Sequence, residues 1–354
     1  MKPITVLVTA CGAPGAPGII KSLRQNGERD IRIIGTDMNA AAVGFSMVDN
    51  HRVMPAGEDP CYVPELLALA IQEQVEVILP LATYELMALS ENIDIFTRNK
   101  ITVCISNPDE LRLANNKGLL FKLMDQSNLP TPRSVMVWDV GSFKKAVFEL
   151  GYPAQPVCFK PQVGHGGRGF RVLDSRLDRY ESLFFTKPDT SISTLDEILT
   201  IIESKNETIP LVVMEYLPGA EFSVDMLLHD NNSLVTVIRR RTRSEQGISF
   251  IGQVVEDDIL KGLAERCAEV LGLDYCINMQ FKQDLSGDCK IIEVNPRLSG
   301  TIVLCTAAGV NLPYLAVKLA LGEKLPQLEL QYGTQVFRYW EEVFCNAEGK
   351  YFRI

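Results

Sequence analysis

Two short stretches, around residues 280 and 293, each read as a β-strand with oxygen-bearing side chains on one face. Within 277–282, apolar and polar residues alternate, which is the period of a strand that buries one face. In the second stretch, Glu293 and Asn295 are two residues apart, so both side chains point to the same face of an extended strand. If the strands pair, Gln280 reaches that face as well. The sequence therefore predicts paired strands that present one carboxylate and two amide groups together.

This set of donors suits a hard divalent cation. Mg²⁺ takes oxygen ligands, keeps several waters and is usually shared with the phosphates of a substrate. Arg297, two residues beyond Asn295, would add a planar cation that suits an anionic substrate or a developing phosphoryl charge. The spacing alone favours a plain hairpin with a polar solvent face, so the rest of the chain must decide between the two interpretations.

Composition narrows the class of protein. The chain has 354 residues, which is enough for two or three domains with a large core. A net charge of −9 argues against non-specific nucleic-acid binding, which needs a basic surface. No stretch approaches the apolar length of a membrane span. We therefore expect no nucleic-acid partner and no membrane association.

The nine cysteines are scattered and include no Cys-x-x-Cys pair. Neither a disulfide framework nor a zinc site is indicated, and a reducing, cytoplasmic setting is expected. The three histidines are far apart and form no metal-binding pattern.

Residues 1–106 alternate strand and helix patterns, which predicts a parallel sheet covered by helices. The expected strands are 4–9, 31–36, 75–81 and 101–105, and the expected helices are 19–25 and 84–96. Residues 83–86, which follow a strand end, are candidates to line a substrate cleft.

The next region begins with a strong helix signal. Asn107 can cap, Pro108 suits the first turn and Glu110 sits at the capping-box position, so one helix is expected to about residue 126, with Lys117 on it. Strands are expected at 134–138, 157–160 and 170–173, and helices at 141–149 and 194–204.

Residues 211–305 read as one antiparallel sheet. Its expected strands are 211–216, 221–228, 234–240 and the two strands around Gln280 and Glu293, with a helix at 257–271 between them. A helix at 313–321 and a strand at 333–339 are expected to follow.

Three glycines, Gly12, Gly15 and Gly18, follow the first strand. Their GxxGxxG spacing departs from the GxGxxG dinucleotide fingerprint, although Asp37 ends the second strand where a ribose acid would lie. A sharp strand-to-helix turn and an anion contact at the helix N-terminus fit this segment equally well. An NAD site is the weakest of the three interpretations.

A second glycine-rich segment lies at 164–169, between two strands and just after Lys160. Its glycines, which let backbone N–H groups approach phosphate oxygens, are Gly164, Gly166, Gly167 and Gly169. By itself, such a loop is more often a flexible turn. Further on, a chain that turns at 217–219 can expose backbone atoms to a flat base, and Glu221 could accept from sugar hydroxyls.

In this order and spacing, these motifs resemble the ATP-grasp superfamily. The likeness is strongest to its carbamoyl-phosphate synthetase large-subunit-like branch, whose metal strands also read Asn-x-Gln-Phe and Glu-x-Asn-Pro-Arg-x-Ser. The resemblance covers about 110–325, and residues 1–106 look like the Rossmann-like pre-ATP-grasp domain. It implies an α/β and α+β chain with a pre-ATP-grasp domain at 1–106, a small or lid subdomain at 107–210 and a C-terminal subdomain with the metal site at 211–354.

The resemblance also implies a role for each motif. Lys117 and Lys160 would contact ATP phosphates, and the 164–169 loop would cover them. Glu215 and Leu217 would bind adenine through backbone atoms, and Glu221 would bind the ribose. Gln280, Glu293 and Asn295 would hold Mg²⁺, with Mn²⁺ as an alternative. Arg297 would meet the acyl substrate or the transferred phosphoryl group. One arginine of the run 239–243 is a candidate to join Arg297 there. The alternative interpretation of that run is a solvated strand edge.

Two departures from the superfamily are visible. Asn116 stands where many relatives have an aspartate before the first lysine. Gln280 replaces the usual carboxylate ligand, a change that the synthetase branch shares. The chain carries one ATP-grasp unit, so carbamoyl phosphate synthesis is not expected as its whole activity.

The implied activity is ADP-forming ligation of a carboxylate to an amine or a related nucleophile, through an acyl phosphate. The partners would then be small-molecule acids and amines, and a homodimer is possible. Two alternatives stay open: an ATP-binding sensor or partner subunit without catalysis, and an NAD-dependent oxidoreductase.

Overall fold

The computed structural model describes residues 1–354 except 165–167, 187–190, 206–209 and 246. The chain divides into two units. The first unit comprises Met1–Arg112, Phe222–Gln280 and Val294–Ile354, and the second comprises Leu113–Glu221 and Phe281–Glu293. The domain boundaries expected at residues 106 and 210 stay predictions.

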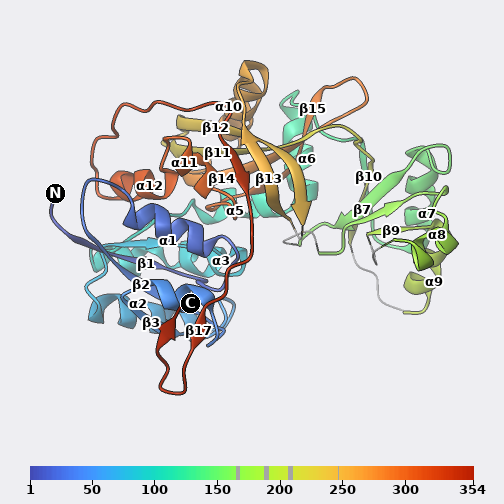
Figure 1. Ribbon diagram of the computed structural model, residues 1–354. Helices are drawn as coiled ribbons and strands as arrows, with labels where there is room; N and C mark the ends of the chain where they lie inside the picture. Colours follow the sequence, from blue (N-terminus) through green and yellow to red (C-terminus); the bar gives the residue numbers. More distant parts are fainter. Residues whose placement is uncertain (165–167, 187–190, 206–209, 246) are drawn as a thin grey trace. The chain divides into compact units, whose positions relative to one another are not determined.

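The amino-terminal region forms a parallel five-stranded sheet with helices on both faces (Figure 1). The strand order is β3-β2-β1-β4-β5. The strands are β1 (Ile4–Val8), β2 (Ile31–Asp37), β3 (Asn50–Val53), β4 (Val77–Leu79) and β5 (Thr102–Val103), and the helical segments are α1 (Ala16–Arg24), η1 (Val43–Met47), α2 (Tyr62–Gln72), α3 (Thr83–Glu91) and α4 (Ile93–Arg98).

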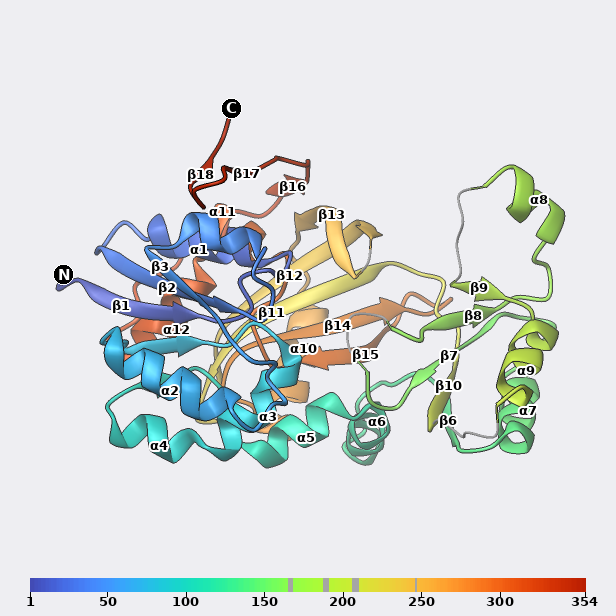
Figure 2. The ribbon, with the colours of Figure 1, turned by 90° about the horizontal axis from the view of Figure 1, so that it is seen from below.

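Alternate residues of β1 explain why both faces of this sheet are covered. Val6 packs in one core cluster with residues of α1, whereas Leu7 packs in another with residues of α2. Successive side chains of a strand point to opposite faces, so a strand with both sets buried needs a helix layer on each side. Figure 2 shows α1 and α2 on opposite sides of the sheet.

A second sheet has six strands in the order β15-β14-β11-β12-β13-β16. The strands are β11 (Glu221–His229), β12 (Asn232–Glu245), β13 (Ile248–Val254), β14 (Tyr275–Gln283), β15 (Cys289–Asn295) and β16 (Gln335–Phe337). The helices of this region are α10 (Asp258–Leu271), α11 (Val303–Ala307) and α12 (Leu312–Ala320), and a two-stranded pair, β17 (Phe344–Cys345) and β18 (Tyr351–Phe352), follows.

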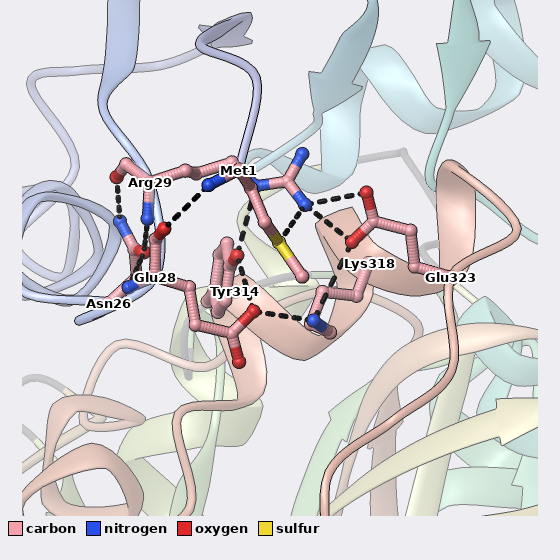
Figure 3. A network of polar contacts seen from close by, with 7 residues as sticks. All are labelled: Met1, Asn26, Glu28, Arg29, Tyr314, Lys318 and Glu323. Carbon is pink, nitrogen blue, oxygen red and sulfur yellow. Dashed lines mark hydrogen bonds and ion pairs between the residues drawn. The ribbon is translucent and has the colours of Figure 1, made fainter.

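A polar network ties α12 to the turn after α1 within the first unit (Figure 3). Arg29 Nη2 lies 2.5 Å from Glu323, and Lys318 Nζ donates to Glu28 at 2.6 Å. Tyr314 links the two pairs, since its hydroxyl accepts from Arg29 Nε and donates to Glu28. The two cationic side chains are only 3% and 4% exposed, so each has the paired carboxylate that a buried charge requires.

The second unit contains a five-stranded sheet in the order β6-β10-β7-β8-β9. The strands are β6 (Ser134–Val137), β7 (Val157–Pro161), β8 (Arg171–Leu173), β9 (Ile192–Ser193) and β10 (Leu211–Glu215). Helix α5 (Pro108–Asn115) begins in the first unit and ends in the second. The other helices of the second unit are α6 (Lys117–Gln126), α7 (Val140–Glu149), α8 (Arg179–Phe184) and α9 (Leu195–Glu203), and residues of α7 and α9 share a core with the sheet.

The fold class expected from the sequence is confirmed, but one strand was assigned to the wrong sheet. The strand at 211–216 forms as β10, yet it pairs with β6 and β7 in the small sheet and not in the long antiparallel one. Its central residues are all buried, so its pattern identifies a strand without specifying the partner.

The single helix expected at 107–126 is also wrong. Asn116 adopts an extended conformation (φ −105°, ψ 107°) and separates α5 from α6. Its side chain caps the second helix, an alternative to helix continuation that asparagine favours. The helix expected at 84–96 is likewise divided into α3 and α4, with a break at Asn92.

Several elements were not predicted, among them β3, α2, β13 and α11. Among the residues that the structure describes, no helix is both long and apolar enough to span a bilayer.

Candidate active site

Lys117 is held at the start of α6 by a well-capped turn of the second unit. The side-chain oxygen of Asn116 accepts from the N–H groups of Gly118 and Leu119 at 3.0 and 3.1 Å. The N–H of Lys117 donates to the carbonyl of Gln162, just after β7, at 3.0 Å. An amide oxygen caps a helix as well as a carboxylate does, so Asn116 fills the position at which many relatives have aspartate.

Two lysines and a carboxylate lie together in the second unit. Lys117 Nζ is 3.6 Å from Glu293 Oε1. Lys160 Nζ donates to the carbonyl of Ile292, beside Glu293 in sequence, at 3.0 Å. Burial lowers the pKa of Lys160 to about 8; Glu293 opposes this shift and Lys117 adds to it. Two cations against one carboxylate leave an excess of positive charge that suits phosphate oxygens.

The glycine-rich loop is described only at its ends. The carbonyl of Gly164 accepts from Lys117 Nζ at 3.0 Å. Gly169 has φ +74°, and a Cβ there would lie 2.6 Å from Pro161, so this position requires glycine. Gly166 and Gly167 lie outside the described residues, so the role of the loop as a lid stays a prediction.

The side chain of Glu215 holds parts of the second unit together. It accepts from the N–H and Nε of Arg133 at 3.0 and 2.9 Å and from Lys290 Nζ at 2.7 Å. Burial raises the pKa of Glu215, but the hydrogen bonds from Lys290 and Arg133 outweigh burial and the pKa is lowered. The expected adenine contact used backbone atoms of Glu215 and Leu217, so this side-chain role is compatible with it. Glu221 begins β11 and is half-buried.

The strands that carry the predicted metal ligands are neighbours. Gln280 lies on β14, and Glu293 and Asn295 lie on β15, which is next to β14 in the sheet. Gln280 and Asn295 belong to the first unit and Glu293 to the second, and the ligand set stays a prediction.

The described part of the chain contains no group of three or more His, Cys, Asp or Glu side chains that could hold a metal. A cation held by the predicted ligands Gln280, Glu293 and Asn295 would therefore depend on two amide oxygens together with one carboxylate. That set fits Mg²⁺, which keeps waters and shares substrate phosphates.

Arg297 is bound on three sides within the first unit. Nη1 donates to the carbonyl of Leu298 at 3.0 Å and Nη2 to Asn295 Oδ1 at 3.4 Å. Nε donates to Thr83 Oγ1, at the start of α3, at 3.2 Å. The guanidinium group is thus adjacent to one predicted metal ligand.

Two family models match the chain. One, described as ATP-grasp in the biosynthetic pathway with Ter operon, matches residues 207–341, and the other, a PylC-like N-terminal domain, matches residues 6–104. The chain carries an ATP-grasp domain. The resemblance on which the sequence analysis relied is therefore confirmed.

Relatives and solved structures agree with an ATP-grasp chain. The carbamoyl phosphate synthase large chain of Clostridium perfringens is 25% identical over 334 residues, which are 90% of this chain and 28% of that relative. An ADP complex of N5-carboxyaminoimidazole ribonucleotide synthetase has a TM-score of 0.70 at 15% identity, over 94% of this chain and 80% of that one. At this identity the likeness shows the fold alone.

The biotin carboxylase domain of 2-oxoglutarate carboxylase from Hydrogenobacter thermophilus, in complex with MgADP, ADP and bicarbonate, has a TM-score of 0.66 at 18% identity, over 94% of this chain and 73% of that one. The present chain spans only 28% of the length of the synthase relative, so the activity of the whole synthase is not carried over.

The arginine run of the ATP-grasp domain contains one buried member. Arg239 is 2% exposed; its Nε donates to Asp225 at 2.5 Å and its Nη2 to Ser299 at 2.9 Å. Asn278 also donates to Asp225, at 3.0 Å. Because Arg239 is buried and β12 lies between β11 and β13, the alternative of a solvated strand edge does not apply to Arg239, whereas Arg240 and Arg243 are exposed. Arg239 stabilises the segment that follows Arg297.

Arg338, which the sequence analysis missed, holds the same segment. Its Nη2 donates to the carbonyl of Gly300 at 2.6 Å and its Nε to the carbonyl of Ser249 at 3.0 Å. Burial and the nearby Arg239 lower its pKa. A single arginine after a short edge strand gives no sequence signal, because its two partners are distant in sequence.

The structure supports the sharp-turn interpretation of the first glycine motif. A Cβ on Gly15 would lie 2.6 Å from the backbone of Gly300, and one on Gly18 would lie 2.9 Å from Val303. Gly12 donates its N–H to Asp37 at 2.6 Å. The glycines allow this loop to pack closely against the segment after β15, and Asp37, the candidate ribose acid, is engaged by the backbone.

Proposed function

We propose that this chain is an ATP-dependent, ADP-forming ligase that joins a carboxylate to an amine or a related nucleophile through an acyl phosphate. The observation that carries the proposal is the group formed by Lys117, Lys160 and Glu293 in an ATP-grasp domain. Two ammonium groups beside one carboxylate neutralise phosphate charge without any nucleophilic residue from the protein.

The reaction would have two steps. A carboxylate oxygen of the acid attacks the γ-phosphorus of ATP, and the bond to the bridging oxygen breaks to release ADP. The amine then attacks the acyl carbon and loses a proton while inorganic phosphate leaves. Such chemistry asks the protein mainly for positioning and charge neutralisation.

In this proposal Lys117 and Lys160 bind phosphate oxygens and Arg297 meets the transferred phosphoryl group. Gln280, Glu293 and Asn295 would hold Mg²⁺, with Mn²⁺ as an alternative, and the bound ion would neutralise charge on the phosphates. Closure of the 164–169 loop would exclude water from the acyl phosphate.

The proposal includes small-molecule acids and amines as partners, a homodimer and a cytoplasmic location. The present chain spans only 28% of the length of a carbamoyl phosphate synthase large chain, so we do not propose the substrates of that synthase for it.

The direct test is ADP release from MgATP over a panel of carboxylates, starting with bicarbonate, each combined with ammonia and simple amino acids. Glu293→Ala should lower the rate at least about 100-fold, because it removes a charged group at the site of phosphoryl transfer. Glu203→Ala, which alters an exposed glutamate of the same unit, should leave the rate unchanged.

Full activity of Glu293→Ala would refute the metal assignment. MgATP binding without ADP release on any acid and amine pair would favour the inactive ATP-binding alternative.

A further inference from the structure

The orientation of Arg297 depends on a residue of the amino-terminal region. Arg297 Nε donates to Thr83 Oγ1 at 3.2 Å, and both residues belong to the first unit. The guanidinium group is planar and its donors have fixed directions, so the acceptor on Nε helps to set the plane in which the other nitrogens lie.

Thr83 is itself held in a rigid turn. It is the first residue of α3 and is 7% exposed. The carboxylate of Glu85, which is buried, accepts from the N–H groups of Leu81 and Ala82 at 3.0 and 2.9 Å. The hydroxyl groups of Thr9 and Tyr62 donate to the same carboxylate, each at 2.5 Å. Four donors on one buried carboxylate fix the start of α3, and with it the position of Thr83.

We propose that Thr83 is a positioning residue for Arg297. Its hydroxyl oxygen accepts the Nε–H of Arg297 and holds the guanidinium plane in the orientation that meets the transferred phosphoryl group. The pre-ATP-grasp region thereby controls the chemistry of the ATP-grasp domain through one hydrogen bond. This inference rests on the proposed function, in which Arg297 contacts that group.

The test compares the affinities of the protein for MgADP and for MgADP with aluminium fluoride, a mimic of the phosphoryl group in transfer, by calorimetry. Thr83→Val removes the acceptor at nearly constant shape, whereas Thr83→Ser keeps it. Thr97→Val is the matched control, since its exposed hydroxyl donates to the carbonyl of Ile93 in its own helix and not to the predicted site.

The wild-type protein should bind the fluoride complex more tightly than MgADP alone. The gain is the ratio of the affinity for the fluoride complex to the affinity for MgADP alone. In Thr83→Val this ratio should fall roughly tenfold, as expected for a lost hydrogen bond to a charged group, with the affinity for MgADP unchanged. Thr83→Ser and Thr97→Val should retain the gain. A merely structural role of Thr83 would weaken both complexes together. Should Thr83→Val fail to fold in a thermal melt, Thr83→Ala carries the same comparison.

An undiminished gain in Thr83→Val would overturn the inference, as would the absence of any gain in the wild-type protein. Failure of the wild-type protein to bind MgADP at all would instead refute the proposed function.

Discussion

The ammonium group of Lys160 has a pKa of about 8, mainly because it is buried. At pH 8.5 the apo protein therefore carries only part of this charge. Phosphate oxygens favour the charged form, so we predict that MgATP binding at pH 8.5 takes up protons. Calorimetry in buffers of different ionisation enthalpy measures the uptake, which Lys160→Met should abolish and Lys122→Met, an exposed position on α6, should retain.

The same shift has a defined sign for stability. The folded-state pKa of Lys160 lies below its ordinary value of 10.5, so the unfolded chain binds more protons between these values. Lys160 thus disfavours folding below pH 8, and this effect is relieved as the pH rises from about 8 toward 10.5.

Equal proton uptake on MgATP binding by the wild-type protein and Lys160→Met would contradict the assignment of Lys160 to the nucleotide site.

Sequence alone identified residues that belong to short patterns. Glu293 and Asn295 share a strand face, and Lys160 precedes a glycine loop, so spacing pointed to all three. Thr83 belongs to the segment 83–86, which a strand end marked as a candidate cleft lining, but its partner Arg297 could not be predicted. Arg338 belongs to no such pattern. The partners of both residues, Arg297 and Gly300, are distant in sequence. Only the tertiary fold brings such pairs together.

At the scale of elements, the loop before α1 is tightly packed against the segment after β15. Gly15→Ala would place a Cβ 2.6 Å from the backbone of Gly300, which cannot move aside as a flexible side chain could. We predict a loss of about 1–3 kcal/mol in the free energy of unfolding, the usual cost of overpacking.

Gly262→Ala is the matched control for this prediction. Gly262 lies inside α10, and among the residues that the structure describes, apart from its own helical turn, no atom would lie within 4 Å of a methyl group added there. This variant should therefore gain about 0.5–1 kcal/mol from the better helix former. Urea unfolding measures both variants. Equal stability of Gly15→Ala and the wild-type protein would show that the close packing at Gly300 is not required.

Helix signals predicted the existence of helices more reliably than their extent. Pro108 marks the start of α5 as expected, but the helical pattern continues through Asn116, whose capping preference alone does not require a break. At the break, the N–H of Lys117 donates to the carbonyl of Gln162, a bond that accompanies the Asn116 cap and is visible only once β7 is in place. The expected boundary therefore failed where tertiary contacts override local preference.

At the scale of the whole molecule, the order of the motifs predicted the ATP-grasp domain, and the domain match confirms it. The sequence did not predict that β10 joins the small sheet, because the burial pattern of a strand does not name its neighbours. Nor did it predict the network in which Arg29 pairs with Glu323 and Lys318 pairs with Glu28, because the partners are 294 and 290 residues apart in sequence.

The central claim is that Lys117, Lys160 and Glu293 form an ATP site. The most direct test is a thermal-shift titration with MgATP, compared with ATP plus EDTA and with NADH, on the wild-type protein and on Lys117→Met and Lys122→Met. A ligand that binds the native state stabilises it by mass action, by about 2.7 kcal/mol at a ligand concentration of 100 times Kd, and this raises the melting temperature. We predict a Mg²⁺-dependent shift with ATP in the wild-type protein and Lys122→Met, a much smaller one in Lys117→Met, and none with NADH. A shift with NADH and none with MgATP would contradict the account.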